Sequence, residues 1–341
     1  MSPVPFFGVN AMASWLVDRG VEAVIADLTD VLEGEFKRWE AFDKTPRIAS
    51  HSREGVIELM PISDESTYAF KYVNGHPLNP TRGFQTVTAF GVLADVHNGY
   101  PTFVAEMTLL TALRTAATSA LAARWLARPD SAVMALIGTG SQAEFQALGM
   151  RAALGINELR VWDVDPEALV KFAANADRLG FDLHVASSGD DAVLGADVIT
   201  TCTADKANAT VLTDAMVGSG VHVNAIGGDC PGKTELDPRI LERAGVFVEY
   251  TPQTRIEGEI QQLPADFPVT ELWQVLTQLE AGRSSADQVT VFDSVGFAIE
   301  DFVALRFVRD QVLGTDLVSL LDLVADPADP KDLFALVSPV A

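Results

Sequence analysis

Cysteine is almost absent from this chain of 341 residues, which contains only Cys202 and Cys230. Two thiols in a chain of this length do not make a disulfide framework, and neither has the paired spacing of a zinc site. The five histidines are scattered, with no His-x-x-x-His pair, so we expect no metal site. Catalysis would then depend on carboxylates, amines and a bound organic cofactor.

Long hydrophobic runs and an excess of basic charge are also missing. No apolar run approaches the roughly 18 residues that a membrane helix needs, and the amino terminus has neither a basic segment nor a recognisable cleavage site. We therefore expect a soluble cytoplasmic protein. The 24 Lys and Arg against 47 Asp and Glu give a formal net charge of −23, which excludes the basic footprint that nucleic acid or an anionic membrane surface requires.

The chain does have the length and the apolar content, 48%, for two domains. A helical opening is followed by short alternating runs that are typical of antiparallel strands, and then by a helical pattern. After Pro129, apolar strands alternate with helices, which is the pattern of a parallel sheet buried on both faces. The expected ranges are helix 11–41, strands 47–52, 56–60, 68–73, 85–96 and 102–107, helix 108–128, and strands 134–138, 159–163, 182–186, 197–203, 222–227, 246–250 and 289–294.

These patterns predict an α/β protein with two domains. The first is an α+β domain of residues 1–129, onto which residues 314–341 fold back. The second is a Rossmann-type, doubly wound nucleotide-binding domain of residues 130–313. Because a different architecture precedes the nucleotide fold, we expect the first domain to carry the substrate contacts.

A glycine loop opens the second domain. Gly138-Thr139-Gly140-Ser141-Gln142-Ala143 matches G-x-G-x-x-A after a predicted strand and before a predicted helix, where unpaired backbone N–H groups can bind a pyrophosphate. Asp163 ends the second strand, 25 positions after the first glycine, at the place of an acid that binds the adenosine ribose. An acid there repels a 2′-phosphate, so NAD is favoured over its phosphorylated relative. The alternative is that Asp163 caps the following helix.

A second loop places a carboxylate behind two glycines. Gly227-Gly228-Asp229 ends the apolar run 221–226, and such an Asp is most often part of a turn. Its position roughly 90 residues after the glycine loop would, however, aim it at a nicotinamide ring from a later strand of the same sheet. Gly227 and Gly228 would then leave room for the nicotinamide.

Three basic residues of the first domain are candidates for binding an anionic substrate. Arg47 and Lys71 stand in strand-like sequence, where a solvent-facing position is the alternative. Arg114 lies in a helix with few other charges, where an unpaired guanidinium would be costly. We therefore expect Arg114 to meet an anion.

Several segments together identify a resemblance. They are 47–52, 55–61, 70–77, 111–117, 291–297, Gly227-Gly228-Asp229-Cys230-Pro231-Gly232-Lys233-Thr234-Glu235-Leu236, and Glu257-Gly258-Glu259-Ile260-Gln261-Gln262-Leu263-Pro264. In these segments the chain resembles the ornithine cyclodeaminase and mu-crystallin family over nearly its whole length. The last two segments are similar to the cyclodeaminase branch in particular.

The resemblance implies a two-domain, dimeric enzyme that converts L-ornithine to L-proline and ammonia with tightly held NAD. Arg47, Lys71 and Arg114 would clamp the substrate carboxylate. Glu58 would orient a substrate amine, Asp229 would act as acid and base, and Val295 would line the pocket. The cofactor-binding positions would be Thr86, Arg114, Gly138, Gly140, Ser141, Gln142, Asp163, Thr203, Ile226, Gly227, Gly228, Asp229, Lys233 and Ser294. Loop packing is the alternative for Lys233 and Ser294.

In the implied reaction, hydride leaves the α-carbon for NAD, the δ-amine attacks the resulting imine, ammonia departs, and the hydride returns to the cyclic imine. One alternative is a family member that runs half of this cycle as an NAD-dependent amino acid dehydrogenase or imine reductase. Another is a cyclodeaminase acting on lysine. A third is a non-catalytic binding protein, which the presence of Asp229 and the three basic residues disfavours.

Overall fold

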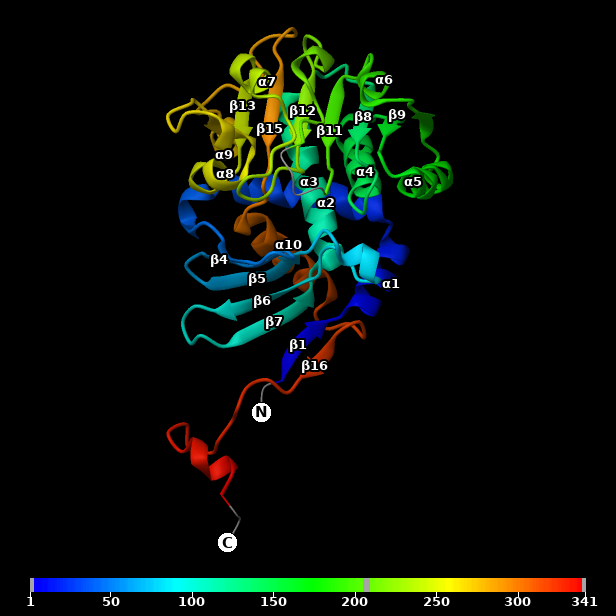
Figure 1. The fold of residues 1–341 in the computed structure, drawn as a ribbon. Helices are drawn as coiled ribbons and strands as arrows, with labels where there is room; N and C mark the ends of the chain where they lie inside the picture. The colour runs from blue at the N-terminus through cyan, green and yellow to red at the C-terminus, as the bar shows by residue number, and fades with distance from the viewer. Residues whose placement is uncertain (1–2, 205–208, 339–341) are drawn as a thin grey trace.

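The computed structural model describes residues 3–204 and 209–338. These residues form two eight-stranded sheets, one above the other in Figure 1, with long helices between them. No helix of the described ranges is long and apolar enough to cross a membrane. The mixed architecture with a parallel sheet confirms the predicted α/β fold class.

The first sheet has the strand order β16-β1-β7-β6-β5-β4-β2, with β3 paired to β4. Its pairs are antiparallel except for β1 with β7. Strands β6 and β7 form a hairpin, in whose turn Gly99 has a φ of 76°. The strands are β1 (Val4–Phe7), β2 (Asp43–Lys44), β3 (Ile48–His51), β4 (Val56–Ser63), β5 (Thr67–Gly75), β6 (Ala89–Asp95), β7 (Pro101–Glu106) and β16 (Ser319–Leu321).

The second sheet is parallel throughout, in the order β10-β9-β8-β11-β12-β15-β13-β14. The chain therefore turns back at β8, as a doubly wound nucleotide fold does. Its strands are β8 (Val133–Ile137), β9 (Glu158–Trp162), β10 (Asp182–Val185), β11 (Val198–Thr201), β12 (His222–Ala225), β13 (Gly245–Val248), β14 (Thr270–Glu271) and β15 (Thr290–Asp293).

Helices cover both sheets. The α-helices are α1 (Val9–Arg19), α2 (Val21–Phe36), α3 (Thr108–Leu126), α4 (Ala143–Leu154), α5 (Pro166–Leu179), α6 (Gly189–Val193), α7 (Pro238–Arg243), α8 (Thr251–Glu257), α9 (Leu272–Leu276) and α10 (Ala298–Val312). Short 3₁₀ helices are η1 (Trp39–Ala41), η2 (Asn79–Arg82), η3 (Asp214–Met216), η4 (Glu259–Gln262) and η5 (Leu333–Leu336). The predicted opening helix is divided between α1 and α2 at Gly20, which has a φ of 82°.

Helices α2 and α3 connect the two sheets (Figure 1). Most of the buried residues of α3 are alanines and leucines. The helix contacts α2, α4 and α10. One apolar cluster consequently continues from Phe7 and Phe103 of the first sheet to Leu136 and Leu159 of the second. Because this shared core is closely packed, it fixes how the two sheets are placed relative to each other.

The two ends of the chain close the first sheet. Strand β16 pairs antiparallel with β1, and residues 322–338 extend away from the body (Figure 1). Helix α10 contacts β4, β5 and β6 as well as α2 and α3. The chain thus returns to the first sheet at Ala298, earlier than the predicted boundary near residue 313, because the apolar face of α10 packs there.

Candidate active site

The candidate residues gather at the carboxyl ends of the parallel strands. The glycine loop follows β8, Thr203 follows β11, the Asp229 loop follows β12, and Ser294 follows β15. In open parallel sheets, ligands bind at this edge. The loops after these strands face the elements of the first sheet that carry Arg47, Glu58 and Lys71.

The glycine loop has the features of a phosphate site. Gly138 has a φ of 101°, and a Cβ there would stand 2.9 Å from the backbone of Cys202. Around the Cβ position of Gly140, in contrast, no described atom lies within 4 Å. The loop enters α4, and the buried Oε1 of Gln142 has no hydrogen-bond partner in the described ranges. The open space and the helix amino terminus fit a dinucleotide pyrophosphate.

Asp163 lies beside this loop at the end of β9. Its Oδ2 accepts hydrogen bonds from the Thr139 backbone N–H at 2.6 Å and from Thr139 Oγ1 at 3.0 Å. The cap of α5 is a different residue, since Asp165 accepts from the backbone N–H of Glu167 at 2.9 Å. The alternative role of Asp163 as a helix cap is therefore wrong, and its position at the strand end suits a ribose.

The Asp229 loop presents its carboxylate outward. The Asp229 side chain is 56% exposed, and Lys233 Nζ lies 3.4 Å from its Oδ1. Lys233 is itself nearly buried and donates to the carbonyl of Thr203 at 3.1 Å. Burial lowers the pKa of Lys233, but Asp229 and Glu235 outweigh it and hold that pKa above its usual value. Lys233 therefore orients Asp229 and joins two of the loops.

The two glycines of this loop are required by carboxylates beneath it. A Cβ on Gly227 would stand 2.0 Å from Glu235 Oε2, and one on Gly228 would stand 2.6 Å from Glu259 Oε1. Glu259 accepts from the backbone N–H of Glu235 at 2.7 Å. The interpretation of these glycines as room for the nicotinamide thus needs correction, because their side-chain directions are occupied by the protein.

Arg47 is held between two acidic side chains. Its Nη1 lies 3.1 Å from Glu58 Oε2, and its Nε lies 3.0 Å from Glu257 Oε2. Its Nη2 donates to the carbonyl of Val295 and, at 2.7 Å, to that of Gly296. The Arg47 side chain is only 6% exposed. The solvent-facing alternative for Arg47 is therefore wrong.

Lys71 and Arg114 meet a pair of acids at the start of α10. Lys71 Nζ lies 2.8 Å from Asp301 Oδ1, and Arg114 Nη1 lies 2.5 Å from Glu300 Oε2. Arg114 Nε also lies 3.1 Å from Asp301 Oδ1. Burial and the nearby Arg114 lower the pKa of Lys71 to about 8. Lys71 is 1% exposed, so its solvent-facing alternative is also wrong, and the anion that Arg114 meets is a protein carboxylate.

The remaining candidates lie after β15, after β12 and in the connection between β5 and β6. Ser294 donates to Glu249 Oε1 at 2.5 Å, and Val295 is buried beside Arg47. Burial, together with the nearby Glu300, raises the pKa of Glu249. Ile226 donates from its backbone to Thr201 at 3.1 Å. Thr86 lies in the connection between β5 and β6, where its carbonyl accepts from the His76 backbone at 2.9 Å.

Sequence reasoning missed the acidic partners of the three basic residues. Glu257 stands in a segment that carried the family resemblance without receiving a role, and Glu300 and Asp301 follow the segment of Ser294 by a few positions. Unpaired basic residues in apolar sequence were the available signal, because buried cations require buried anions.

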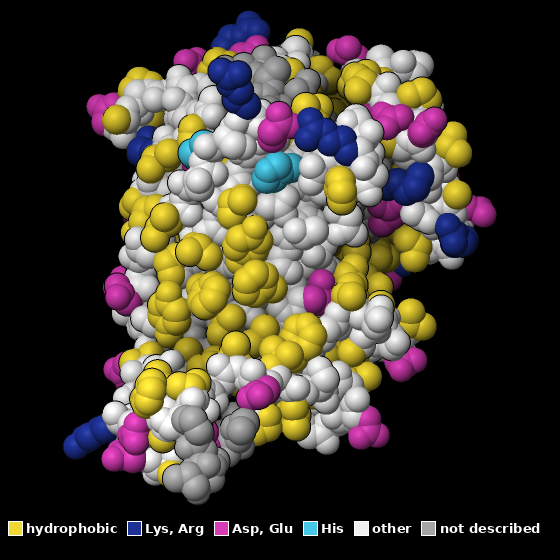
Figure 2. All heavy atoms as spheres, turned by 60° about the horizontal axis from the view of Figure 1, so that its bottom comes forward, with side chains coloured by type: hydrophobic (Ala, Val, Ile, Leu, Met, Phe, Trp, Pro, Cys, Tyr) yellow, Lys and Arg dark blue, Asp and Glu magenta, His cyan; other side chains and the backbone are white. Residues whose placement is uncertain are grey.

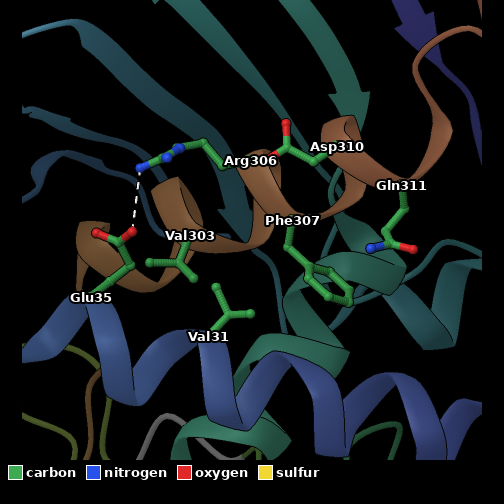
Figure 3. A pocket seen from close by; sticks show the side chains of 7 residues that line it. All are labelled: Val31, Glu35, Val303, Arg306, Phe307, Asp310 and Gln311. Atoms are coloured by element: carbon green, nitrogen blue, oxygen red, sulfur yellow. Dashed lines mark hydrogen bonds and ion pairs between the residues drawn. The ribbon is translucent and has the colours of Figure 1, made fainter.

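A hollow in the helical layer lies apart from these candidate residues. Within residues 3–204 and 209–338, no group of three or more His, Cys, Asp or Glu could hold a metal ion. The hollow, of about 210 Å³, lies between α2 and α10, where Arg306 and Glu35 approach to 3.4 Å (Figure 3). It is lined by Val31, Glu35, Val303, Arg306, Phe307, Asp310 and Gln311.

The fold and the site define a two-domain dinucleotide-binding protein with an exposed carboxylate beside a cluster of buried ion pairs. The chain belongs to the ornithine cyclodeaminase/mu-crystallin family, whose model matches residues 9–316. This confirms the resemblance seen in the sequence.

Individual relatives extend over nearly the whole chain. An ornithine cyclodeaminase of Agrobacterium fabrum is 60% identical over 334 residues, which cover 98% of this chain and 94% of that protein. An L-lysine cyclodeaminase of Streptomyces rapamycinicus is 33% identical over 94% of each. A solved lysine cyclodeaminase matches with a TM-score of 0.93 and 34% identity, covering 98% and 100% of the two chains. An archaeal alanine dehydrogenase dimer with bound NAD matches with a TM-score of 0.85 and 29% identity, covering 95% and 100%.

Proposed function

We propose that this protein is an NAD-dependent ammonia-lyase that converts L-ornithine to L-proline and ammonia. The observation that carries the proposal is the 60% identity to an ornithine cyclodeaminase over 98% of the chain. The geometry of the site supports it, because an exposed carboxylate lies beside three buried basic groups and the nucleotide loop.

The basic residues bind the substrate carboxylate. Arg47, Lys71 and Arg114 come from three different elements and converge through shared acidic partners, since Asp301 contacts both Lys71 and Arg114. A guanidinium has five N–H donors, so Arg47, with two carboxylate and two carbonyl partners, and Arg114, with two carboxylate partners, each keep at least one donor for a substrate carboxylate. Glu58, on the inner side of β4, accepts from the substrate amine, and Val295 lines the wall beside Arg47.

Asp229 moves protons at the substrate nitrogen atoms. Its side chain is 56% exposed, and its Oδ1 contacts Lys233 Nζ at 3.4 Å, so the carboxylate is accessible to a ligand. A carboxylate in this position can take the proton that the δ-amine must lose before ring closure, and can return it to the departing ammonia. Holding the substrate curled also favours ring closure through orientation.

The nucleotide loop holds NAD, which when bound takes a hydride from the α-carbon and returns it to the ring imine. Gly138, Gly140, Ser141 and Gln142 would bind the pyrophosphate, and Asp163 would bind the ribose. The other positions proposed on the cofactor side are Thr86, Arg114, Thr203, Ile226, Gly227, Gly228, Asp229, Lys233 and Ser294.

Incubation of the purified protein with NAD and L-ornithine tests the function. Proline and ammonia in equal amounts, without accumulation of NADH, are expected. Stoichiometric NADH and an oxo-acid would instead indicate an amino acid dehydrogenase, a possibility raised by the similarity to the archaeal alanine dehydrogenase. L-Lysine is assayed in parallel, because the lysine cyclodeaminases are also similar to this chain.

The outer face of the first sheet supports a homodimer. Figure 2 shows hydrophobic side chains gathered over the face that lies at the bottom of Figure 1. Alternation along β4 exposes Ile57 and Leu59 at 41% and 42%. Phe90 of β6 is 43% exposed and lies in register with Leu59 across Tyr72 of β5. An apolar face of this kind on a folded protein marks an interface. The alanine dehydrogenase of similar fold is a dimer.

The dimer is tested with Leu59→Glu. Because its side chain points away from the site while that of Glu58 points inward, we expect the variant to sediment as a monomer with an unchanged nucleotide site. Glu54→Gln, at an exposed ion pair with Arg82, is the matched control. A Leu59→Glu variant with the same sedimentation coefficient as the wild type would remove this face from the interface.

A cytoplasmic location also remains part of the proposal, since catalytic use of NAD requires the intracellular pool.

A further inference from the structure

Two buried carboxylates approach the same guanidinium from opposite elements. Glu58 extends from β4, and Glu257 is the last residue of α8; both are about 3 Å from Arg47, at 3.1 Å and 3.0 Å. Helix α8 is fixed in place because Gln253 accepts from the Arg47 backbone at 3.0 Å and donates to the carbonyl of Gly296 at 2.8 Å. The position of Glu257 is thus defined by the same contacts that define Arg47.

Each of these carboxylates has an oxygen without a hydrogen bond. Glu58 Oε1 and Glu257 Oε2 are buried and accept from no donor in the described ranges, although Glu257 Oε2 keeps its ion pair with Arg47 Nε. The two side chains are only 7% and 6% exposed. A buried carboxylate oxygen that lacks a donor favours a ligand that supplies one.

The charges around Arg47 do not balance. Arg47 faces Glu58 and Glu257, and Asp229 is near enough to influence both Arg47 and Glu257 electrostatically. Asp229 has Lys233 as its own partner, so the single guanidinium of Arg47 stands against the two carboxylates of Glu58 and Glu257. Burial raises the pKa of Glu257 to about 7, with Glu58 and Asp229 acting in the same direction and Arg47 opposing them. A second positive charge in this place would be stabilised.

We propose that Glu257 is a specificity-determining residue that binds the distal ammonium group of a diamino acid, beside Glu58. The substrate carboxylate would bind the same guanidinium of Arg47 that Glu257 contacts. The proposal rests on the proposed function of this site. A substrate held by both ends around one arginine is curled, which is the shape that ring closure requires. A monoamino acid of equal length would offer Glu257 no ammonium group and leave it with Arg47 as its partner.

L-Ornithine and L-norvaline test this directly, because they differ only in the distal amine. Binding is measured calorimetrically in the presence of NADH, with which neither amino acid can be oxidised. The wild type is expected to bind ornithine at least about tenfold more tightly than norvaline, and Glu257→Gln to reduce that preference by about tenfold through weaker ornithine binding. Glu54→Gln is expected to leave the preference unchanged.

A conservative variant separates binding from structure. Glu257→Asp keeps the charge and is expected to retain more of the preference for ornithine than Glu257→Gln, with norvaline affinity equal in all folded variants. The preference of the wild type should also fall below about pH 7, where Glu257 becomes protonated. If Glu257→Gln does not fold, Glu257→Asp and this pH dependence decide the question.

The outcomes are distinct from those of the function itself. An unchanged preference for ornithine in a folded Glu257→Gln variant, or a wild-type preference that does not fall below about pH 7, would overturn the role of Glu257, even if the wild type forms proline. Absence of proline from the wild type would overturn the proposed function, while the binding preference would still report on Glu257.

Discussion

Asp229 differs from the other charged residues of the site in its exposure. Its side chain is 56% exposed, whereas those of Arg47, Lys71 and Arg114 are exposed by 7% or less. Buried ion-paired groups hold a fixed charge and geometry, while an exposed carboxylate can exchange protons with a ligand or with water. In the proposed function, the buried basic residues therefore bind the substrate carboxylate, and Asp229 transfers protons.

Asp229→Asn tests this division. The amide keeps the size of the side chain but cannot accept a proton, so we expect the rate of proline formation to fall by about 10²–10⁴-fold. NAD binding should stay within about twofold, because the nucleotide loop and Asp163 lie on β8 and β9. Product assays and an NAD titration by protein fluorescence measure the two effects. Turnover at the wild-type rate would remove Asp229 from the mechanism.

At the scale of elements, the loop after β12 is supported by η4. Asp293 accepts from the backbone N–H groups of Glu259 and Ile260 at 2.8 and 2.9 Å, and Glu259 in turn accepts from those of Glu235 and Leu236. Each carboxylate thus fixes the backbone of the next segment. The Asp229 loop is therefore placed by the buried acids Glu259 and Asp293.

Gly228→Ala should disturb this support. Its Cβ would stand 2.6 Å from Glu259 Oε1, so the carboxylate must move and both stability and activity should fall, the free energy of unfolding by about 1–3 kcal/mol. Gly34→Ala is the control, because no described atom lies within 4 Å of its Cβ position in α2. That change should raise the free energy of unfolding by about 0.5–1 kcal/mol. Urea unfolding measures both, and equal effects would contradict the packing.

The strand β4 shows how one element serves two surfaces. Val56, Glu58, Met60 and Ile62 point inward, and the side chains between them point outward. The period of two along a strand therefore places Glu58 in the site and Leu59 on the outer face. A register shift of one residue in this strand would turn Glu58 outward and Leu59 inward. It would therefore remove Glu58 from the candidate site and Leu59 from the proposed interface.

At the scale of the whole molecule, buried acids link stability to pH. Burial raises the pKa of Glu259 to about 8 and that of Asp293 to about 7. In the unfolded chain both lie near 4, so the folded state binds more protons between these values. The stability that they contribute is complete below about pH 4 and is lost as the pH rises through 7 to 8.

The midpoint of thermal unfolding should therefore fall between pH 6.5 and pH 8. Burial lowers the pKa of His222 to about 3, so this group is neutral in the folded state and loses its contribution only below about pH 6.5. Glu259→Gln, which stays neutral throughout, should flatten the dependence, and Glu54→Gln should not. Scanning calorimetry across this range tests the prediction, and a midpoint that rises with pH would contradict it.

The sequence by itself determined the order of the elements and the chemistry at the ends of the strands. Period-two and apolar runs predicted most strands of both sheets, because these patterns depend only on which face each residue buries. The short strands β1, β2, β14 and β16 were missed, since two to four residues carry no periodicity and are fixed by their neighbours. The glycine loop, Asp163 and Asp229 were found because spacing along the chain places them at one edge of a parallel sheet.

Only the tertiary structure decided which charges meet. Arg47 pairs with Glu257, and Lys71 with Asp301, across more than 200 positions of sequence. Such pairs depend on how α8 and α10 pack against the first sheet, and no local pattern encodes that packing. The reason is that desolvation makes an unpaired buried charge too costly, so the fold that buries a cation must also deliver its anion.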